Sequence, residues 1–384
     1  MNRTEQMREL TRRALEHYRN GTTDQAESVM RIPVAAYLDP DRYKREIERV
    51  FKRLPLALAL SIEIPAPGDY RATEVLGVPV ILVRGRDGRA RAFINACRHR
   101  GAQVCKPGNG HARVFTCPYH AWAYDSEGRL VSRYAADTFG EVDHDQLGLT
   151  ELWCEERVGL VYVLLTPGET CAIDDWLGDF AAELAHLALD SWTIFETREL
   201  DGPGWKVALD GYLEAYHHNS LHGRTVGKFT IGNLLVLDTW GPHQRLTFGR
   251  KSLADLVEQP ESDWNVNAHI RLIHNCFPNL SISGILGDHC LVSQIFPGPT
   301  PATTTTRQVV LVAEPPTTEA ARAASEAFSA VVLQAVRDED YAVGGTIQAG
   351  LGSGANREFV FGRNEPAVQN YHRTIARLMG EPTS

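Results

Sequence analysis

Four residues with metal-binding side chains lie in two short pairs, Cys97-Arg-His99 and Cys117-Pro-Tyr-His120. Each pair is next to a β-like segment, so the two pairs could converge on one metal centre. A structural zinc site is one alternative, but zinc pairs usually run Cys-x2–4-Cys and then His-x3–5-His. Here each pair supplies one thiolate and one imidazole. This mixed pairing favours a two-iron cluster in which one iron takes both thiolates and the other both imidazoles.

A second group of candidate ligands follows in the segment D-G-Y-L-E-A-Y-H-H-N-S-L-H at 210–222. On a helix, Asp210, Glu214 and His217 share one face, because they are spaced at i, i+4 and i+7. Two imidazoles with one carboxylate leave positions on Fe(II) open for O2. The segment therefore predicts a mononuclear iron site. The alternative is a pair of histidines at an exposed helix end.

The choice of histidines is ambiguous by helical geometry alone. His218 and His222 are spaced at i, i+4 and would face the same way. His217 and His222 are spaced at i, i+5, which is about 140° apart on an ideal helix. A site that uses His217 therefore requires the helix to distort or to end, and Gly223 could end it.

The two groups of candidate ligands lie in regions with different predicted secondary structure. From 56 to 165, short β-forming runs alternate with Gly, Pro and Asp-Gly turns, which predicts a small all-β module with metal-bearing loops. The rest of the chain mixes helical and strand-like patterns, which predicts an α+β arrangement. We expect helices at 3–19, 40–51 (with Asp39 as N-cap), 175–189, 204–223 and 317–343, and strands at 233–240, 243–250, 280–286, 289–297 and 307–315.

Composition narrows the function classes. The 384 residues carry a formal net charge of -9, which disfavours a nucleic-acid-binding protein. The start of the sequence is polar and lacks the apolar stretch of a secretory signal. The apolar runs at 54–62 and 158–165 are far too short to span a bilayer, so no membrane association is expected. Seven cysteines with uneven spacing do not suggest a disulfide framework, and a cytoplasmic location is expected.

The two loop sequences NACRHRGAQVC (95–105) and CPYHAWAYDSEGRLV (117–131) closely resemble the Rieske loops. The pattern E-x-x-H-x4-H at 214–222 follows them in the order typical of one family. From about Tyr37 to Leu351, the chain resembles the α-subunits of Rieske non-haem iron oxygenases, the aromatic-ring-hydroxylating dioxygenases. The resemblance implies an α+β fold with an all-β Rieske [2Fe–2S] module and a helix-grip catalytic domain, an antiparallel sheet with long helices. The expected boundaries are an N-terminal helical segment packing on the catalytic domain at 1–55, the Rieske domain at 56–165 and the catalytic domain at 166–384.

The resemblance also assigns ligands. It implies that the paired loops bind a [2Fe–2S] cluster through Cys97, His99, Cys117 and His120. It selects His217 and His222 as ligands of a mononuclear Fe(II), with His218 as a neighbour. The stretch D-E-D at 338–340, followed by Q-A-G-L at 348–351, resembles the family helix whose Asp completes the triad. That match selects Asp340, and Asp338 is the alternative.

Two further carboxylates are implied at the catalytic site, Glu214 and Asp210. In the family, an Asp or Glu at the Glu214 position links an iron histidine to a Rieske histidine of the adjacent subunit. Glu214 is therefore expected to contact His217 and, across an interface, His120. Ala121 departs from the family pattern, which commonly has Gly at this position. The two glycines at 344–345 also depart from it, because bulkier residues are expected there.

The implied activity is that of a terminal oxygenase component that uses electrons and O2 to hydroxylate an organic, aromatic or apolar ring substrate, as in aromatic hydrocarbon catabolism. One alternative is an oxidative demethylase or hydroxylase of a quaternary ammonium compound. An alternative of another class is a Rieske electron-transfer or sensing protein without chemistry. The implied partners are an NAD(P)H-dependent flavin and iron–sulfur reductase or a ferredoxin, and further copies of the chain in a homotrimer.

The sequence says least about the substrate pocket. Its walls are expected from 231–296, and no Arg or Lys stands out there as a binding group for a carboxylate. The candidate wall residues are Leu234, Leu235, Trp240, Phe248, His269, Ile273, Phe277, Ile282 and Ile285.

Overall fold

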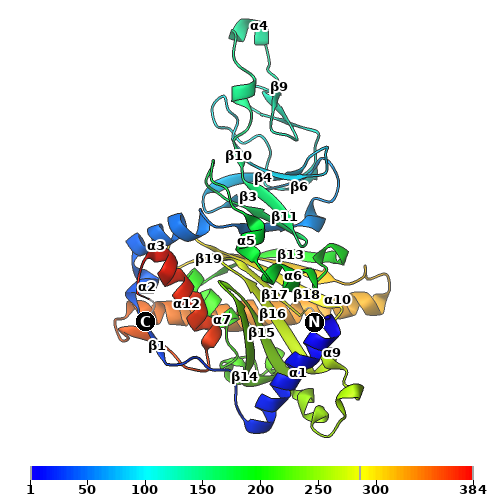
Figure 1. The fold of residues 1–384 in the computed structure, drawn as a ribbon. Helices are drawn as coiled ribbons and strands as arrows, with labels where there is room; N and C mark the ends of the chain where they lie inside the picture. The colour runs from blue at the N-terminus through cyan, green and yellow to red at the C-terminus, as the bar shows by residue number, and fades with distance from the viewer. Residues whose placement is uncertain (1, 285–286, 383–384) are drawn as a thin grey trace. The chain divides into compact units, whose positions relative to one another are not determined.

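The computed structural model describes residues 2–284 and 287–382, and the chain divides into two compact units (Figure 1). One unit comprises 1–47, 182–187 and 191–384, and the other comprises 48–181 and 188–190. The domain boundaries expected after residues 55 and 165 remain predictions. Within the described ranges, no helix combines the length and apolar character needed to cross a membrane.

The unit at 48–181 is built almost entirely from short antiparallel strands. They form sheets in the orders β10-β5-β4-β3-β6, β7-β8-β9 and β11-β12-β2. The elements are β2 (Leu56–Leu60), β3 (Asp69–Val75), β4 (Val78–Arg84), β5 (Ala90–Ile94), β6 (Gly108–His111), β7 (Val114–Thr116), β8 (Ala123–Asp125), β9 (Leu130–Ser132), α4 (Ala136–Phe139), β10 (Glu151–Leu152), β11 (Cys154–Arg157), β12 (Leu160–Val163) and α5 (Ile173–Leu177). The all-β module expected from the turn-rich sequence is therefore present.

The other unit is organised by a seven-stranded antiparallel sheet in the order β13-β19-β18-β17-β16-β15-β14. Its strands are β13 (Thr193–Gly202), β14 (Thr230–Trp240), β15 (His243–Arg250), β16 (Ile270–Cys276), β17 (Leu280–Ser283), β18 (His289–Pro297) and β19 (Thr304–Val312). The helices around the sheet are α1 (Arg3–Asn20), α2 (Ala35–Leu38), α3 (Pro40–Glu46), α6 (Phe180–Ala185), α7 (Trp205–Tyr212), α8 (His218–Leu221), α9 (Val266–His269), α10 (Glu319–Leu333), α11 (Ala342–Gly352) and α12 (Pro366–Met379), and β1 (Met30–Pro33) pairs with β20 (Glu358–Phe361).

Helix α1 covers one face of this sheet. Asn2 and Glu5 form a capping box at its start, and its apolar stripe, including Leu10 and Ala14, is buried against Leu272 of β16 and neighbouring strands. Side chains alternate between the two faces of a strand. Because Leu272 faces α1, Arg271 lies on the opposite face, which is the face of the candidate site.

Helix α10 runs on through a π-helical segment, η8 (Gln334–Tyr341), into α11 (Figure 1). Val332 packs on Leu291 and Val310 of the sheet. In the next turn, Val336 packs with Ala208 of α7. π-Helical turns are rare and are frequently found at functional sites. This one carries the acidic residues at 338–340.

Two expected helices are interrupted in the structure. The segment 175–189 contains the end of α5 and the whole of α6, which are separated by Gly178 with a positive φ of 50°. The segment 204–223 is divided into α7 and α8 by an irregular stretch at 213–217. The strands β13 and β16 were not predicted, and the last two residues of the strand expected at 280–286 lie outside the described residues.

Candidate metal centres

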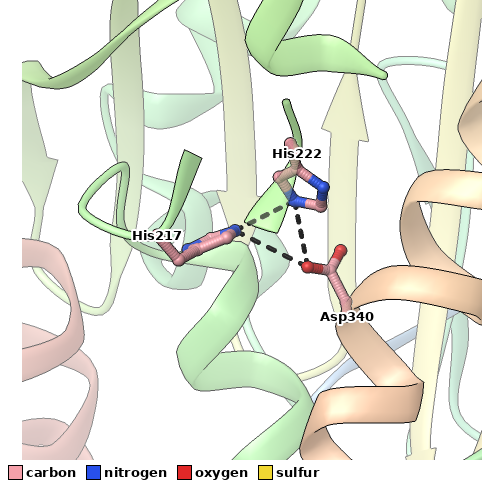
Figure 2. A group of neighbouring side chains, drawn as sticks. All are labelled: His217, His222 and Asp340. Carbon is pink, nitrogen blue, oxygen red and sulfur yellow. Dashed lines mark hydrogen bonds and ion pairs between the residues drawn. The ribbon is translucent and has the colours of Figure 1, made fainter. Parts of the chain in front are cut away.

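Three side chains converge beside the end of α7, where the chain leaves the helix before entering α8. His217, His222 and Asp340 each offer a ligand atom, and these atoms lie within 4.8 Å of one another (Figure 2). The Nε2 atoms of the two histidines are 3.0 Å apart. Asp340 Oδ1 lies 3.0 Å from the His222 Nε2 and 3.5 Å from the His217 Nε2. This group could hold a divalent metal and leave coordination positions open.

The structure leaves the alternative residues outside this group. The His218 ring is buried, and its centroid lies 5.3 Å from that of Phe248. Burial, helped by the nearby His217 and Arg271, lowers the pKa of His218 well below its usual value, so this imidazole is neutral. Asp338 is exposed and pairs with Arg337 at 2.6 Å.

The second nitrogen of each converging histidine is occupied by a carboxylate. Glu214 accepts a hydrogen bond from His217 Nδ1, as expected, and also from the His217 backbone N–H at 3.1 Å. Glu339 Oε2 lies 2.6 Å from His222 Nδ1 and accepts from the Thr225 hydroxyl. Carboxylates in such positions fix the tautomer and the orientation of a metal-binding imidazole.

The role of Glu339 was missed by the sequence analysis, although the residue directly precedes Asp340. Both side chains contact the same imidazole, Glu339 at Nδ1 and Asp340 at Nε2. Burial lowers the pKa of His222, but these two carboxylates outweigh burial and raise the pKa overall. The π-helical turn thus supplies two consecutive acidic residues to one histidine.

Asp210 is held by other partners. Its carboxylate accepts from the Tyr37 hydroxyl at 2.7 Å and contacts His372 Nε2 at 2.7 Å. Asp210 also lines a groove of about 260 Å³ together with Glu214 and Glu365. Burial raises the pKa of Glu365 to about 7, and the charges of Glu214 and Asp210 add to the effect. The catalytic role expected for Asp210 remains a prediction.

Two adjoining cavities lie on the sheet side of the triad. The smaller, about 60 Å³, is lined by the triad, His218 and Ile273, and the larger, about 370 Å³, by the apolar side chains of Phe229 and Phe328 among others. Both are lined by Arg271, whose role as a candidate binding group the sequence analysis missed. Ile273 is the one expected wall residue that lines these cavities within the described ranges, and Ile285 lies outside them.

The two Cys/His loops of the β-rich unit bring their ligand types together. Cys97 and Cys117 are buried in one core cluster with Trp122, whereas the two histidines are partly exposed. The rings of His99 and His120 have centroids 4.8 Å apart. His120 Nδ1 is a buried ring nitrogen without a hydrogen-bond partner among the described residues. Two buried thiolates and two adjacent imidazoles, one with a free nitrogen, fit a cluster in which one iron takes two cysteines and the other takes two histidines.

Two family models match the chain in the same order as these sites. Residues 55–143 match the Rieske [2Fe-2S] domain. Residues 189–381, which span half of the chain, match the ring hydroxylating alpha subunit (catalytic domain). This chain belongs to the ring-hydroxylating α-subunit family. The expected cofactors, a [2Fe–2S] cluster and non-haem iron, are those of this family, and the fold class expected from the motifs is confirmed.

Three curated proteins are similar to this chain over part of their length. The carnitine monooxygenase oxygenase subunit of Escherichia coli (strain K12) is 34% identical over 197 residues, which cover 50% of this chain and 52% of the relative. The glycine betaine monooxygenase oxygenase subunit of Chromohalobacter salexigens is 33% identical over 50% of this chain and 43% of the relative. The benzene 1,2-dioxygenase subunit alpha of Pseudomonas putida is 34% identical over 50% of this chain and 44% of the relative. The chain thus matches about half the length of these relatives.

Two solved structures share the fold over almost the whole chain. The quaternary ammonium Rieske monooxygenase CntA in complex with L-carnitine superposes with a TM-score of 0.78 at 22% identity, covering 94% of this chain and 97% of that chain. Naphthalene 1,2-dioxygenase from Rhodococcus sp. gives a TM-score of 0.73 at 20% identity, covering 97% and 98%. At these identities the likeness establishes the fold.

Proposed function

We propose that this chain is the terminal oxygenase component of a Rieske-type mono- or dioxygenase. The observation that carries the proposal is the convergence of His217, His222 and Asp340 in a chain that also has a Rieske domain. When bound, the cluster would supply single electrons and Fe(II) would supply open positions for O2. Monooxygenation places one oxygen atom in the substrate and releases the other as water, whereas dioxygenation places both in the substrate. Either reaction consumes two electrons and two protons.

Each converging residue has a role in this proposal. His217, His222 and Asp340 bind the iron, and Cys97, His99, Cys117 and His120 bind the cluster. Glu214 holds His217 through Nδ1 and presents that imidazole to the metal. Asp210, anchored by Tyr37 and His372, stays beside Glu214 as the second carboxylate of the site.

Two substrate classes are candidates. Hydroxylation of an aromatic or apolar ring, as in aromatic hydrocarbon catabolism, is supported by the likeness to the benzene dioxygenase subunit. Oxidation of a quaternary ammonium compound is supported by the likeness to the carnitine and glycine betaine monooxygenase subunits, at similar identity. Electrons would come from an NAD(P)H-dependent flavin and iron–sulfur reductase, directly or through a ferredoxin. The cytoplasm is the proposed location, because seven cysteines with uneven spacing do not suggest a disulfide framework.

A single-turnover experiment tests the proposed function. The reduced protein, freed of reductant, is mixed with ¹⁸O2 and with benzene, toluene, carnitine or glycine betaine in separate reactions. We expect the cluster absorbance to recover its oxidised form and ¹⁸O to appear in the product of at least one compound. Reoxidation that leaves every compound unchanged would favour the electron-transfer or sensing class instead.

We further propose that the active site is shared between subunits of a homotrimer. The groove that contains Glu214 is flanked by exposed apolar side chains, including Val360 at 54% and Val343 at 40% exposure. An apolar surface of this kind is typical of a contact site. The Rieske loops carry the exposed Tyr119 next to His120. A Rieske loop of a neighbouring chain would place His120 against Glu214, and head-to-tail contacts of this kind can close into a ring.

Glu214→Gln tests this arrangement. Because the amide can still contact His217 but carries no charge, both metal sites and the oligomer should persist while electron transfer from cluster to iron slows. Stopped-flow reoxidation of the reduced cluster measures this rate. Unchanged transfer in Glu214→Gln would contradict the bridging role, and a fully active monomer would contradict the shared site.

A further inference from the structure

The strongest feature that the metal sites do not explain is a pair of arginines on the inner face of the sheet. Arg271 in β16 stands opposite Phe248 of β15, and Arg250 lies two residues beyond Phe248. Residues two apart on a strand point to the same face. Arg250 is therefore the diagonal neighbour of Arg271, at a distance that lets long side chains meet. Both arginines line the 370 Å³ cavity, and Arg271 also lines the cavity beside the triad.

Among the residues that the structure describes, no group forms a hydrogen bond or an ion pair with the guanidinium of Arg271 or Arg250. The acidic group on the cavity wall, Asp288, is exposed and pairs with His289 at 2.6 Å. Asp340 acts on Arg271 electrostatically, but its Oδ1 faces the histidines. Burial and, to a smaller extent, the charge of the nearby Arg250 lower the pKa of Arg271 to about 10, so the environment opposes its charge.

Two like charges on one sheet face are destabilising unless an anion lies between them. Arginine presents a planar set of donors that matches a carboxylate in two parallel hydrogen bonds. The remaining wall of the larger cavity is mainly apolar, with Phe229, Phe328 and Val331. A ligand that fits these walls combines one anionic head with an apolar body.

Resting on the oxygenase function proposed above, we propose that the substrate is an organic carboxylate whose carboxylate group binds to Arg271 with Arg250 beside it. Arg271 lines both cavities, so it holds the head group where the larger cavity meets the space beside the triad. The apolar body lies in the larger cavity, and one end of it reaches the space beside the triad, where the oxygenase function requires the carbon that is oxidised. A cation without a carboxylate is disfavoured at this place by the two positive charges. The arginines thus act as specificity-determining residues.

Calorimetric binding to the oxidised holoprotein tests this inference without turnover. Each carboxylate is compared with its uncharged amide: benzoate with benzamide, phenylacetate with phenylacetamide, and hexanoate with hexanamide. We expect at least one carboxylate to bind more tightly than its amide. Arg271→Gln should weaken the binding of that carboxylate about ten- to hundredfold, because a charged hydrogen bond is lost, and should leave the binding of the amide unchanged. Arg271→Lys should recover part of the loss, because it restores the charge.

Lys251→Gln is the matched control, since it removes an exposed positive charge next to Arg250 that lines neither cavity. It should bind every compound as the natural protein does. Equal binding of carboxylate and amide in the natural protein, or equal weakening of both in Arg271→Gln with the cluster spectrum intact, would overturn the inference. Carboxylate binding without oxygenation of any bound acid would contradict the oxygenase function and leave the anion site standing. Oxygenation restricted to neutral compounds would support the oxygenase function and contradict the anion site.

Discussion

Both histidines of the proposed iron site use one ring nitrogen for the metal position and give the other to a glutamate. Glu214 takes the Nδ1 of His217, and Glu339 takes the Nδ1 of His222. The two glutamates differ in surroundings: Glu214 lines the groove proposed to meet a neighbouring chain, whereas Glu339 is tied to Thr225. We therefore expect Glu214 to act on electron transfer and Glu339 on metal affinity.

Glu339→Ala should weaken Fe(II) binding about 10- to 100-fold, because the His222 ring loses the carboxylate that orients it. Titration of apoprotein with Fe(II) under anaerobic conditions measures the affinity. Asp338→Ala is the control, since Asp338 is an exposed neighbour that pairs with Arg337. Equal Fe(II) affinity in Glu339→Ala and the natural protein would contradict the orienting role of Glu339.

The sequence pointed to His217, His222 and Asp340 through motifs that resemble those of the family, because helical spacing alone left the choice between His217 and His218 open. It could not identify Glu339 or Arg271 by the same route. An acidic residue in a run of three acids looks like a solvated surface group, and only the η8 turn shows that it faces His222. Arg271 precedes buried Leu272 in a strand that the sequence analysis did not predict. The face to which it points depends on the register with β15.

At the scale of elements, the loops and helix breaks position the ligands. The helix expected at 204–223 ends at Tyr212, and the irregular stretch at 213–217 turns His217 towards His222. The i, i+5 spacing of these histidines predicts a helix that distorts or ends. The predicted stop at Gly223 lies beyond α8. Residues 213–217 contain no Gly or Pro, so propensity alone could not locate the break.

Ala121 marks a local strain in the second Rieske loop. Its φ is 54°, in the left-handed region that costs a residue with a Cβ atom roughly 1–2 kcal/mol. Ala121→Gly should therefore raise the stability of the cluster-bearing loop by about 0.5–1 kcal/mol, after allowing for the freedom of Gly in the unfolded chain. The temperature at which the cluster absorbance is lost measures this gain. Ala102→Gly in the first loop, at a residue without positive φ, should lower that temperature, and a rise in both variants would contradict the assignment of strain.

Glu183 of α6 joins several elements of the catalytic unit. Its buried carboxylate is 2.7 Å from both His274 Nε2 and Arg245, and it also accepts from Gln6 at 2.7 Å. Burial raises the pKa of Glu183, but the hydrogen bond and charge of His274, with Arg245, outweigh it and lower the pKa overall. Glu183→Gln should lower the free energy of unfolding by about 2 kcal/mol, because it removes the charge that pairs with buried Arg245 and accepts from His274.

The sign of the pH effect follows from the lowered pKa. A carboxylate with a depressed pKa in the folded state stabilises the protein above its unfolded-state pKa of about 4.5, and this stabilisation is lost as pH falls. Chemical denaturation between pH 7 and pH 4 should therefore show a steeper loss of stability in the natural protein than in Glu183→Gln. Glu358→Gln, which removes an exposed pair with Arg31, is the control and should follow the natural protein. Parallel pH profiles for all three proteins would contradict this role of Glu183.

At the scale of the whole molecule, the shared-site proposal predicts complementation between two inactive chains. His99→Ala should lose the cluster and Asp340→Ala should lose the mononuclear iron. If electrons pass between subunits, mixed oligomers should recover activity, because an intact cluster in one chain can serve an intact iron site in its neighbour. Activity after co-expression, with native mass measurement of the oligomer, tests this. Mixed trimers that remain inactive would contradict transfer between chains.

The most direct test of the oxygenase proposal is the iron content of matched variants. The natural protein should hold three irons per chain, two in the cluster and one at His217, His222 and Asp340. Asp340→Ala should hold two, with the Rieske visible spectrum unchanged and no turnover, and Asp338→Ala should still hold three. Two irons per chain in the natural protein, or loss of the third iron in Asp338→Ala but not in Asp340→Ala, would contradict the proposed site.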